Sequence, residues 1–173
     1  MKHLKILGGL LIAYTLNSCS LFSEAEPTEL PPATQTGANT FGCLVNGKLF
    51  VPKSGGNYEG ITKNYDGGLG LAALYVKDKQ VENGIGISTP LLNGVGKYLL
   101  EKPKSLWHNA FHDRNLAPLN ASVTITKFER GEDKANNLRW LIISGTFEGV
   151  LLPESKYKDT IRITEGRFDV KFN

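Results

Sequence analysis

The chain has 173 residues, 40% of them hydrophobic and 21% charged, which is typical of one globular domain and not of a disordered or fibrous chain. Its 20 basic and 17 acidic side chains give a formal net charge of +3, but two of the basic residues, Lys2 and Lys5, lie in a predicted leader, which leaves 18 against 17. The remaining chain has neither a clustered basic stripe nor an interleaved aromatic platform, so we expect no nucleic-acid partner.

Residues 1–18 have the pattern of a secretory signal peptide. A basic head containing Lys2, His3 and Lys5 overlaps the start of an apolar run from Leu4 to Leu16. This run is shorter than the roughly 20 residues that a membrane-spanning helix needs. A permanent transmembrane anchor is therefore the weaker interpretation.

The end of this leader, Leu16-Asn17-Ser18-Cys19, resembles the lipobox of bacterial lipoproteins. The resemblance implies cleavage after Ser18 and lipidation of Cys19, although Asn17 departs from the family's usual small or hydroxyl residue. The alternative is an ordinary leader that is cut elsewhere. With two or more acyl chains the attachment to the membrane would be effectively permanent.

Residues 19–39 are predicted to be the lipidated cysteine and a flexible tether, because the segment is rich in Pro, Thr, Glu and Ala and has no periodicity. Glu24 and Glu26 resemble the acidic export signal of Bacteroidota lipoproteins. We therefore expect a lipid anchor in the outer membrane, with a periplasmic or surface-exposed domain. Acidic residues are, however, also common in any solvated linker.

Residues 40–173 are predicted to form a single β domain. Asn46-Gly47, between residues 41–45 and 48–51, is a strong signal for a tight β-hairpin. Further strands are predicted at 69–77, 81–88, 95–100, 121–128 and 138–152, with an edge strand at 109–112 and a charged turn at 130–137. Gly84 and Gly86 indicate a bend or a bulge.

In the last segment, residues 160–172, the apolar positions change parity at Gly166. Side chains alternate strictly along a strand, so either a bulge at Gly166 or a two-residue turn at Glu165-Gly166 is required. Roughly nine strands and no convincing long helix predict an all-β fold, an antiparallel β-sandwich or a flattened barrel. Cys43 lies in an apolar strand and is expected to be a buried core residue.

Residues 40–50, 143–147 and 163–170 resemble the opening hairpin and closing strands of small Bacteroidota lipoproteins grouped as domains of unknown function. The resemblance covers both ends of the globular part and leaves out its middle. It implies an envelope location and a β-rich fold, and it carries no catalytic residues.

Candidate chemistry is confined to one region. His108 and His112, with Asp113 beside them, are the only histidines after the leader, but a strand would separate them by about 13 Å, too far to share one ion. No activated nucleophile, metal site or cofactor is predicted. Trp107, His108, Phe111 and His112 are candidate ligand contacts.

Two hypotheses for the function follow. The first is a non-catalytic, lipid-anchored binding or interaction module for a glycan or a protein ligand. The second is a small envelope hydrolase or metal-dependent enzyme that uses His108, His112 and Asp113. A third class, a structural subunit, would need strand exchange between chains.

Overall fold

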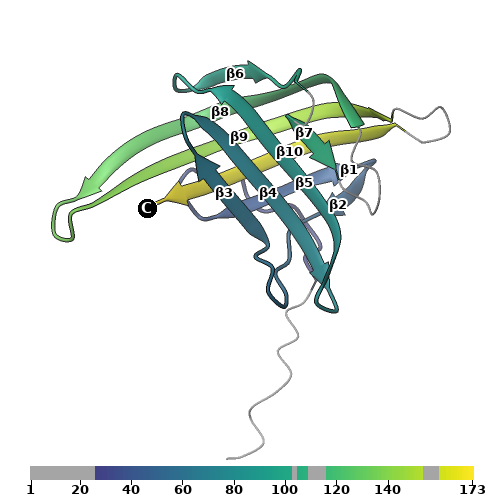
Figure 1. Ribbon diagram of the computed structural model, residues 1–173, viewed down its shortest axis with the longest axis horizontal. Helices are drawn as coiled ribbons and strands as arrows, with labels where there is room; N and C mark the ends of the chain where they lie inside the picture. Colours follow the sequence, from purple (N-terminus) through teal and green to yellow (C-terminus); the bar gives the residue numbers. More distant parts are fainter. Residues whose placement is uncertain (1–25, 103–104, 109–115, 154–159) are drawn as a thin grey trace, which may run out of the picture.

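The computed structural model describes residues 26–102, 105–108, 116–153 and 160–173. The predicted leader and Cys19 lie outside these residues. The described chain contains no helix, and its strands form two antiparallel sheets that pack together (Figure 1). The predicted all-β fold is confirmed in its sandwich form. A helix of the length and apolarity needed to span a membrane is accordingly not found in the described residues.

Ten strands lie in the described part of the chain. The larger sheet has the order β2-β1-β10-β9-β8-β6, with β1 (Thr40–Val45), β2 (Lys48–Phe50), β6 (Gly96–Leu99), β8 (Leu116–Asp133), β9 (Leu138–Pro153) and β10 (Ile161–Phe172). The smaller sheet has the order β3-β4-β5-β7, with β3 (Ile61–Tyr65), β4 (Gly68–Lys77), β5 (Gln80–Leu91) and β7 (Leu106–His108). The first and last strands are therefore neighbours inside the larger sheet.

The predicted hairpin at Asn46-Gly47 is confirmed. Both residues have positive φ, 49° and 76°, as a type I′ turn requires. Asn46 also fixes the hairpin to β10, because its backbone N–H donates to the Arg162 carbonyl at 2.8 Å and its Oδ1 accepts from the Arg162 N–H at 2.7 Å.

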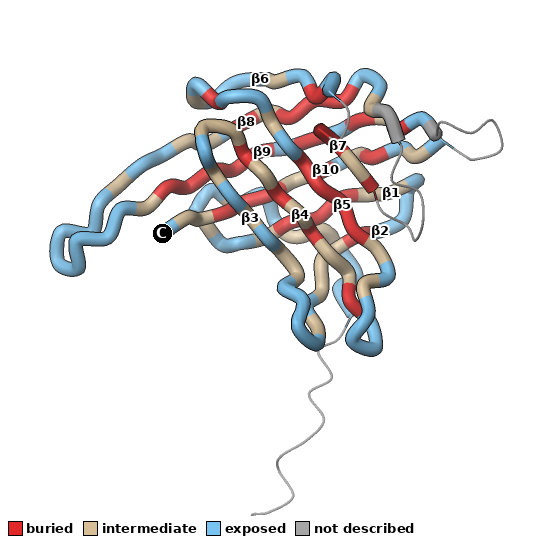
Figure 2. The backbone as a smooth tube through the Cα atoms, in the orientation of Figure 1, coloured by how far each residue is buried: buried red, intermediate tan, exposed pale blue. Residues whose placement is uncertain are grey.

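The core lies between the inner faces of the two sheets, and the buried residues are concentrated in their central strands (Figure 2). Cys43 is fully buried among these residues, as predicted. The main contributors are Phe41, Leu69, Leu71, Ile85, Ile87, Leu106, Val123, Ile125, Ile143, Phe147, Leu151, Ile163, Phe168 and Val170.

Residues 161–172 form one continuous strand with a bulge, which decides between the two alternatives at Gly166. Between Ile163 and Gly166, β10 has two residues where β9 has one. Glu165 takes the left-handed conformation with φ 53°. The extra residue keeps both Ile163 and Phe168 in the core, and Gly166 is required because a Cβ there would lie 2.4 Å from the Phe147 carbonyl oxygen.

The charged turn predicted at 130–137 is shorter in the structure, where it covers only residues 134–137. β8 continues to Asp133 and β9 begins at Leu138, so that the two strands project beyond the sandwich as a long ribbon (Figure 1). Trp140 lies over its paired residue Gly131, where a Cβ would be 2.1 Å from the indole Cζ2. Because this ribbon is solvated on both sides, its sequence has no apolar alternation that would identify a strand.

Two strands of the smaller sheet were not predicted. β3 has partly buried Ile61 and Tyr65, but Lys63 stands between them and breaks the apolar pattern. β7 is a three-residue edge strand. It ends directly before the edge strand predicted at 109–112, which lies outside the described residues.

The described part of the predicted tether, residues 26–39, lies against the outer face of the larger sheet. We call it the N-terminal strap. A Cβ on Gly42 would lie 2.6 Å from Pro31 Cδ, and one on Gly37 would lie 3.1 Å from Ile142 Cγ1. The packed body therefore begins before Thr40, and the strap explains why β9 is buried on both faces at this point.

A buried carboxylate holds the strap in place. Asp169 is only 1% exposed. It accepts hydrogen bonds from Thr34 Oγ1 (2.7 Å), Ser144 Oγ (2.7 Å) and the backbone N–H groups of Thr36 (2.9 Å), Gly37 (2.9 Å) and Ala38 (3.0 Å). Burial by itself would raise the pKa of the Asp169 carboxyl, but these hydrogen bonds outweigh it and lower the pKa to about 2.

Candidate binding site on the smaller sheet

The structure separates the residues that the sequence nominated as ligand contacts. Trp107 and His108 are neighbours on β7, so their side chains point to opposite faces of the smaller sheet. Trp107 is on the outer face and partly exposed, whereas His108 is on the inner face and 6% exposed. Phe111, His112 and Asp113 lie outside the described residues.

His108 is a buried side chain and not a surface ligand. Neither of its ring nitrogens has a hydrogen-bond partner among the described residues, and burial lowers the pKa of the imidazole. Throughout the described residues, no group of three or more metal-ligating side chains is close enough to hold an ion. His108 is therefore a neutral imidazole in the core.

Trp107 lies across glycines of the neighbouring strand. It is paired with Gly86, and a Cβ at that position would lie 2.0 Å from the indole Cε2 and 2.1 Å from Nε1. A Cβ on Gly84 would lie 3.4 Å from Cζ3 of the same ring. No bulge lies at the two glycines themselves, because both are regularly paired with β4; the register irregularity of β5 comes before them, at Glu82. The two glycines make room for the indole instead.

Beside the indole, the outer face of the smaller sheet is a shallow hollow of about 500 Å³. We call it the Trp107 trough. Its lining residues are Thr62, Lys63, Asn64, Gly70, Leu71, Ala72, Ile87, Ser88 and Trp107. The surface is hollowed here because glycines or small side chains occupy the outward positions of the two central strands, β4 and β5.

The register of the strands arranges these residues in rows across the sheet. Thr62 pairs with Ala72, which pairs with Gly86, which pairs with Trp107. In the adjacent row Asn64 pairs with Gly70, which pairs with Ser88. With strands about 4.8 Å apart, the two edge strands β3 and β7 are roughly 14 Å from each other.

Several polar groups of the Trp107 trough have no partner in the described chain. The Asn64 amide lies over Gly70, and neither it nor the Ser88 hydroxyl makes a hydrogen bond to a described residue. The indole N–H of Trp107 has no acceptor there either. The Thr62 hydroxyl makes one long contact, 3.4 Å, to the Ala72 carbonyl. Among the described residues, nothing therefore occupies the hydrogen-bonding positions of Asn64, Ser88 and the indole N–H.

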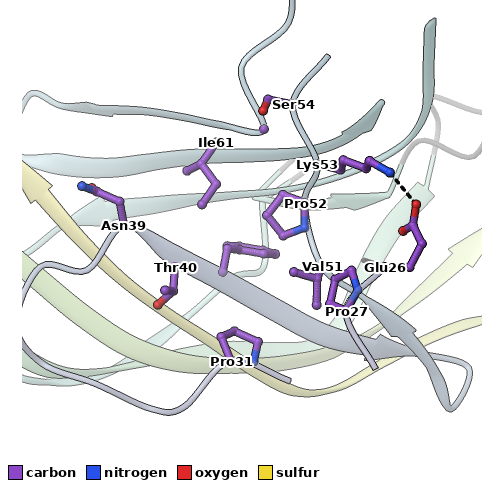
Figure 3. A pocket seen from close by; sticks show the side chains of 12 residues that line it. Glu26, Pro27, Pro31, Asn39, Thr40, Val51, Pro52, Lys53, Ser54 and Ile61 are labelled. Carbon is purple, nitrogen blue, oxygen red and sulfur yellow. Dashed lines mark hydrogen bonds and ion pairs between the residues drawn. The ribbon is translucent and has the colours of Figure 1, made fainter. Parts of the chain in front are cut away.

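A second hollow, of about 480 Å³, lies between the N-terminal strap, β1 and the loop after β2 (Figure 3). Pro27, Pro31 and Pro52 are among the apolar side chains around it, and Figure 3 shows the ion pair of Lys53 with Glu26 at its rim. Sequence reasoning placed the strap residues in a free tether and did not find this hollow.

The charged and amide side chains around this second hollow are already paired, whereas the Thr40 and Ser54 hydroxyls make no hydrogen bond to a described residue. The Glu26 carboxylate accepts hydrogen bonds from Lys53 and from Tyr75 Oη at 3.1 Å, and these bonds, that of Lys53 first, lower the pKa of the carboxyl. Asn39 Oδ1 accepts from Lys63 Nζ and from the Lys171 N–H at 3.2 Å. We therefore interpret this hollow as the place where the strap packs against the domain, and the Trp107 trough is the better candidate site.

Cys43 offers no nucleophile. Burial raises the pKa of its thiol to about 12, so the thiolate is not populated at neutral pH. Of the trough residues, the sequence nominated only Trp107. The sequence did contain a signal for this surface, a set of small residues at alternate positions: Gly70 and Ala72 line the trough, and Gly84 and Gly86 lie beneath the indole.

No family model matches this chain, and no curated protein or solved structure matches it either.

Proposed function

We propose that this protein is a lipid-anchored protein of the bacterial cell envelope, a non-catalytic module that binds its ligand in the Trp107 trough. The single observation that carries the binding role is the partly exposed indole of Trp107, which lies on Gly86 beside an amide and a hydroxyl that have no partner among the described residues. Concave surfaces with an aromatic wall and a few free polar groups are typical ligand sites.

The chemistry of the trough supports binding more than catalysis. Its outward-facing side chains are hydroxyl, amide, indole and small apolar groups, none of which is a general acid or base at neutral pH. Lys63, the ionisable lining residue, donates a hydrogen bond from its ammonium group to Asn39. Its side chain lies on the opposite face of β3 from those of Thr62 and Asn64. The hydrolase hypothesis gains no support from His108, which faces the core.

The membrane anchor is proposed from the lipobox resemblance at Cys19. If that residue carries lipid, the N-terminal strap shortens the free tether, because Glu26 is held by Lys53 and Tyr75. Seven residues of fully extended chain reach at most about 25 Å. The sandwich would then stay close to the bilayer surface, with the Trp107 trough on the face away from the strap.

The anchor is tested by expressing the chain with its leader in cells fed an alkyne fatty acid. We expect the wild-type chain to take up the label and to fractionate with membranes, and a Cys19→Ser variant to do neither. An unlabelled wild-type chain with a bare thiol at Cys19 would remove the lipid anchor from the proposal.

The binding role is tested by NMR on the ¹⁵N-labelled mature chain. It contains two tryptophans, Trp107 and Trp140, and each lies on a glycine to which it is paired. We expect the indole N–H signal of Trp107 to shift with at least one member of a panel of neutral glycans, acidic glycans and peptides, while that of Trp140 does not. The binding role fails if no panel member shifts the Trp107 signal, or if both signals always shift together.

A further inference from the structure

We propose that the ligand of the Trp107 trough is an uncharged sugar chain, one ring of which stacks on the indole of Trp107. This inference rests on the proposed function and adds the chemical class of the ligand. It follows from three properties of the trough: the aromatic surface, the kind of hydrogen-bonding group, and the charge.

The aromatic surface is flat and lies against the sheet. One face of the Trp107 indole rests on the backbone of Gly86 and Gly84, and the ring lines the hollow. The face of an aromatic ring carries partial negative charge. The axial C–H groups of a pyranose ring are apolar and slightly positive, so a sugar ring can cover the indole while its hydroxyls point sideways to polar partners.

The polar groups beside the indole match hydroxyl groups. Asn64 offers both an acceptor oxygen and two N–H donors, and Ser88 and Thr62 offer hydroxyls that donate and accept. A sugar hydroxyl also donates and accepts, so each of these groups can pair with it in either direction. The indole N–H adds a donor at the edge of the ring.

The charge of the trough argues for a neutral ligand. Recognition of a phosphate or carboxylate normally uses arginine or lysine side chains. The charged lining residue here is Lys63, and its ammonium group is hydrogen-bonded to Asn39 and lies 5.8 Å from the Phe172 ring centre. Strand addition, one common mode of peptide binding, uses a sheet edge, whereas the trough crosses the strands.

The shape favours a chain over a single sugar. The trough crosses the smaller sheet from one edge strand, β3, toward the indole on the other edge strand, β7, and these two strands are roughly 14 Å apart. It is shallow and lies on a sheet surface, so a polymer can lie across it without an end entering the protein.

The test is isothermal titration calorimetry on the mature chain with soluble neutral glycans (a β-glucan, a mannan and a xylan) and with polygalacturonate and hyaluronate as acidic counterparts. We expect at least one neutral glycan to bind. Trp107→Ala should then lower the affinity by about tenfold or more, as loss of an aromatic stacking partner does, and Asn64→Ala should lower it by several-fold.

Trp140→Ala is the matched control, because it also removes an indole from a paired glycine but lies on the projecting ribbon. It should leave the affinity unchanged. Trp107→Phe, which keeps a ring over Gly86, should retain part of the binding if Trp107→Ala proves too unstable to measure.

The outcomes separate the two proposals. Binding of a neutral glycan that depends on Trp107 supports both. A Trp107-dependent ligand that is acidic or a peptide overturns the sugar assignment and leaves the binding module standing. Neutral glycan binding that Trp107 variants do not weaken places the site elsewhere and overturns the inference, as does the absence of any neutral glycan binding.

Discussion

Ser144 donates its hydroxyl hydrogen bond to Asp169 at 2.7 Å, between two residues that are paired across β9 and β10. Both side chains are buried, on the face of the larger sheet that the N-terminal strap covers. The strap completes the arrangement, because Thr34, 135 residues earlier in the chain, donates to the same carboxylate. Asp169 therefore joins the beginning of the domain to its last strand.

Replacing Asp169 by Asn should destabilise the protein by about 2 kcal/mol, because the amide nitrogen would face hydrogen-bond donors that now meet a carboxylate oxygen. Urea unfolding monitored by circular dichroism measures this change. Ser144→Ala removes one donor only and should cost about 1 kcal/mol. If Asp169→Asn unfolds at the wild-type urea concentration, the carboxylate does not hold the strap.

Stability should also depend on acid pH through Asp169. Its folded-state pKa of about 2 lies below the ordinary value of 3.8, so the unfolded chain binds the proton first. The stabilisation is complete above about pH 4 and is lost as the pH falls toward 2, by about 2 kcal/mol in all. Thermal unfolding between pH 2 and 6 should show a shallower acid slope for Asp169→Asn than for the wild type. Parallel slopes would contradict this.

His108 predicts a second, separate pH dependence. Burial lowers its folded-state pKa below the ordinary value of 6.5, so protonation favours the unfolded chain. Stability should therefore decrease as the pH falls below about 6.5, and His108→Leu should remove this part of the dependence. At pH 8 the variant should be as stable as the wild type or more stable, because it buries no unpaired nitrogen. A less stable variant at pH 8 would indicate that the imidazole has a partner.

Gly166→Ala should destabilise the fold by roughly 3 kcal/mol, because its Cβ would lie 2.4 Å from a backbone oxygen and 2.7 Å from the ring of Phe147. Gly47→Ala is the control. No atom lies within 4 Å of a Cβ there, so only the strain of its positive φ, about 1 kcal/mol, should appear. Chemical denaturation of the two variants provides the comparison, and equal losses would show that the bulge can relax.

Local sequence was sufficient for the features that depend on neighbours along the chain. Asn46-Gly47 predicted its hairpin because positive φ is a property of the residues themselves. The strand at 121–128 was predicted because one of its faces is solvated and its side chains alternate. The parity change at Gly166 showed that an extra residue must be accommodated, although the choice of a bulge required knowledge of the facing strand. The projecting ribbon was missed because both its faces meet water.

By itself, then, the sequence determined the fold class, the tight turns and the inward position of the alternating apolar residues, since each follows from the period of a strand. Only the tertiary structure decided that Asp169 binds the strap, that Trp107 faces out while His108 faces in, and that Gly84 and Gly86 form the floor beneath an indole. The reason is physical: these relations join strands that are distant in sequence, and a residue's pattern along its own strand does not specify what the neighbouring strand or the covering segment places against it.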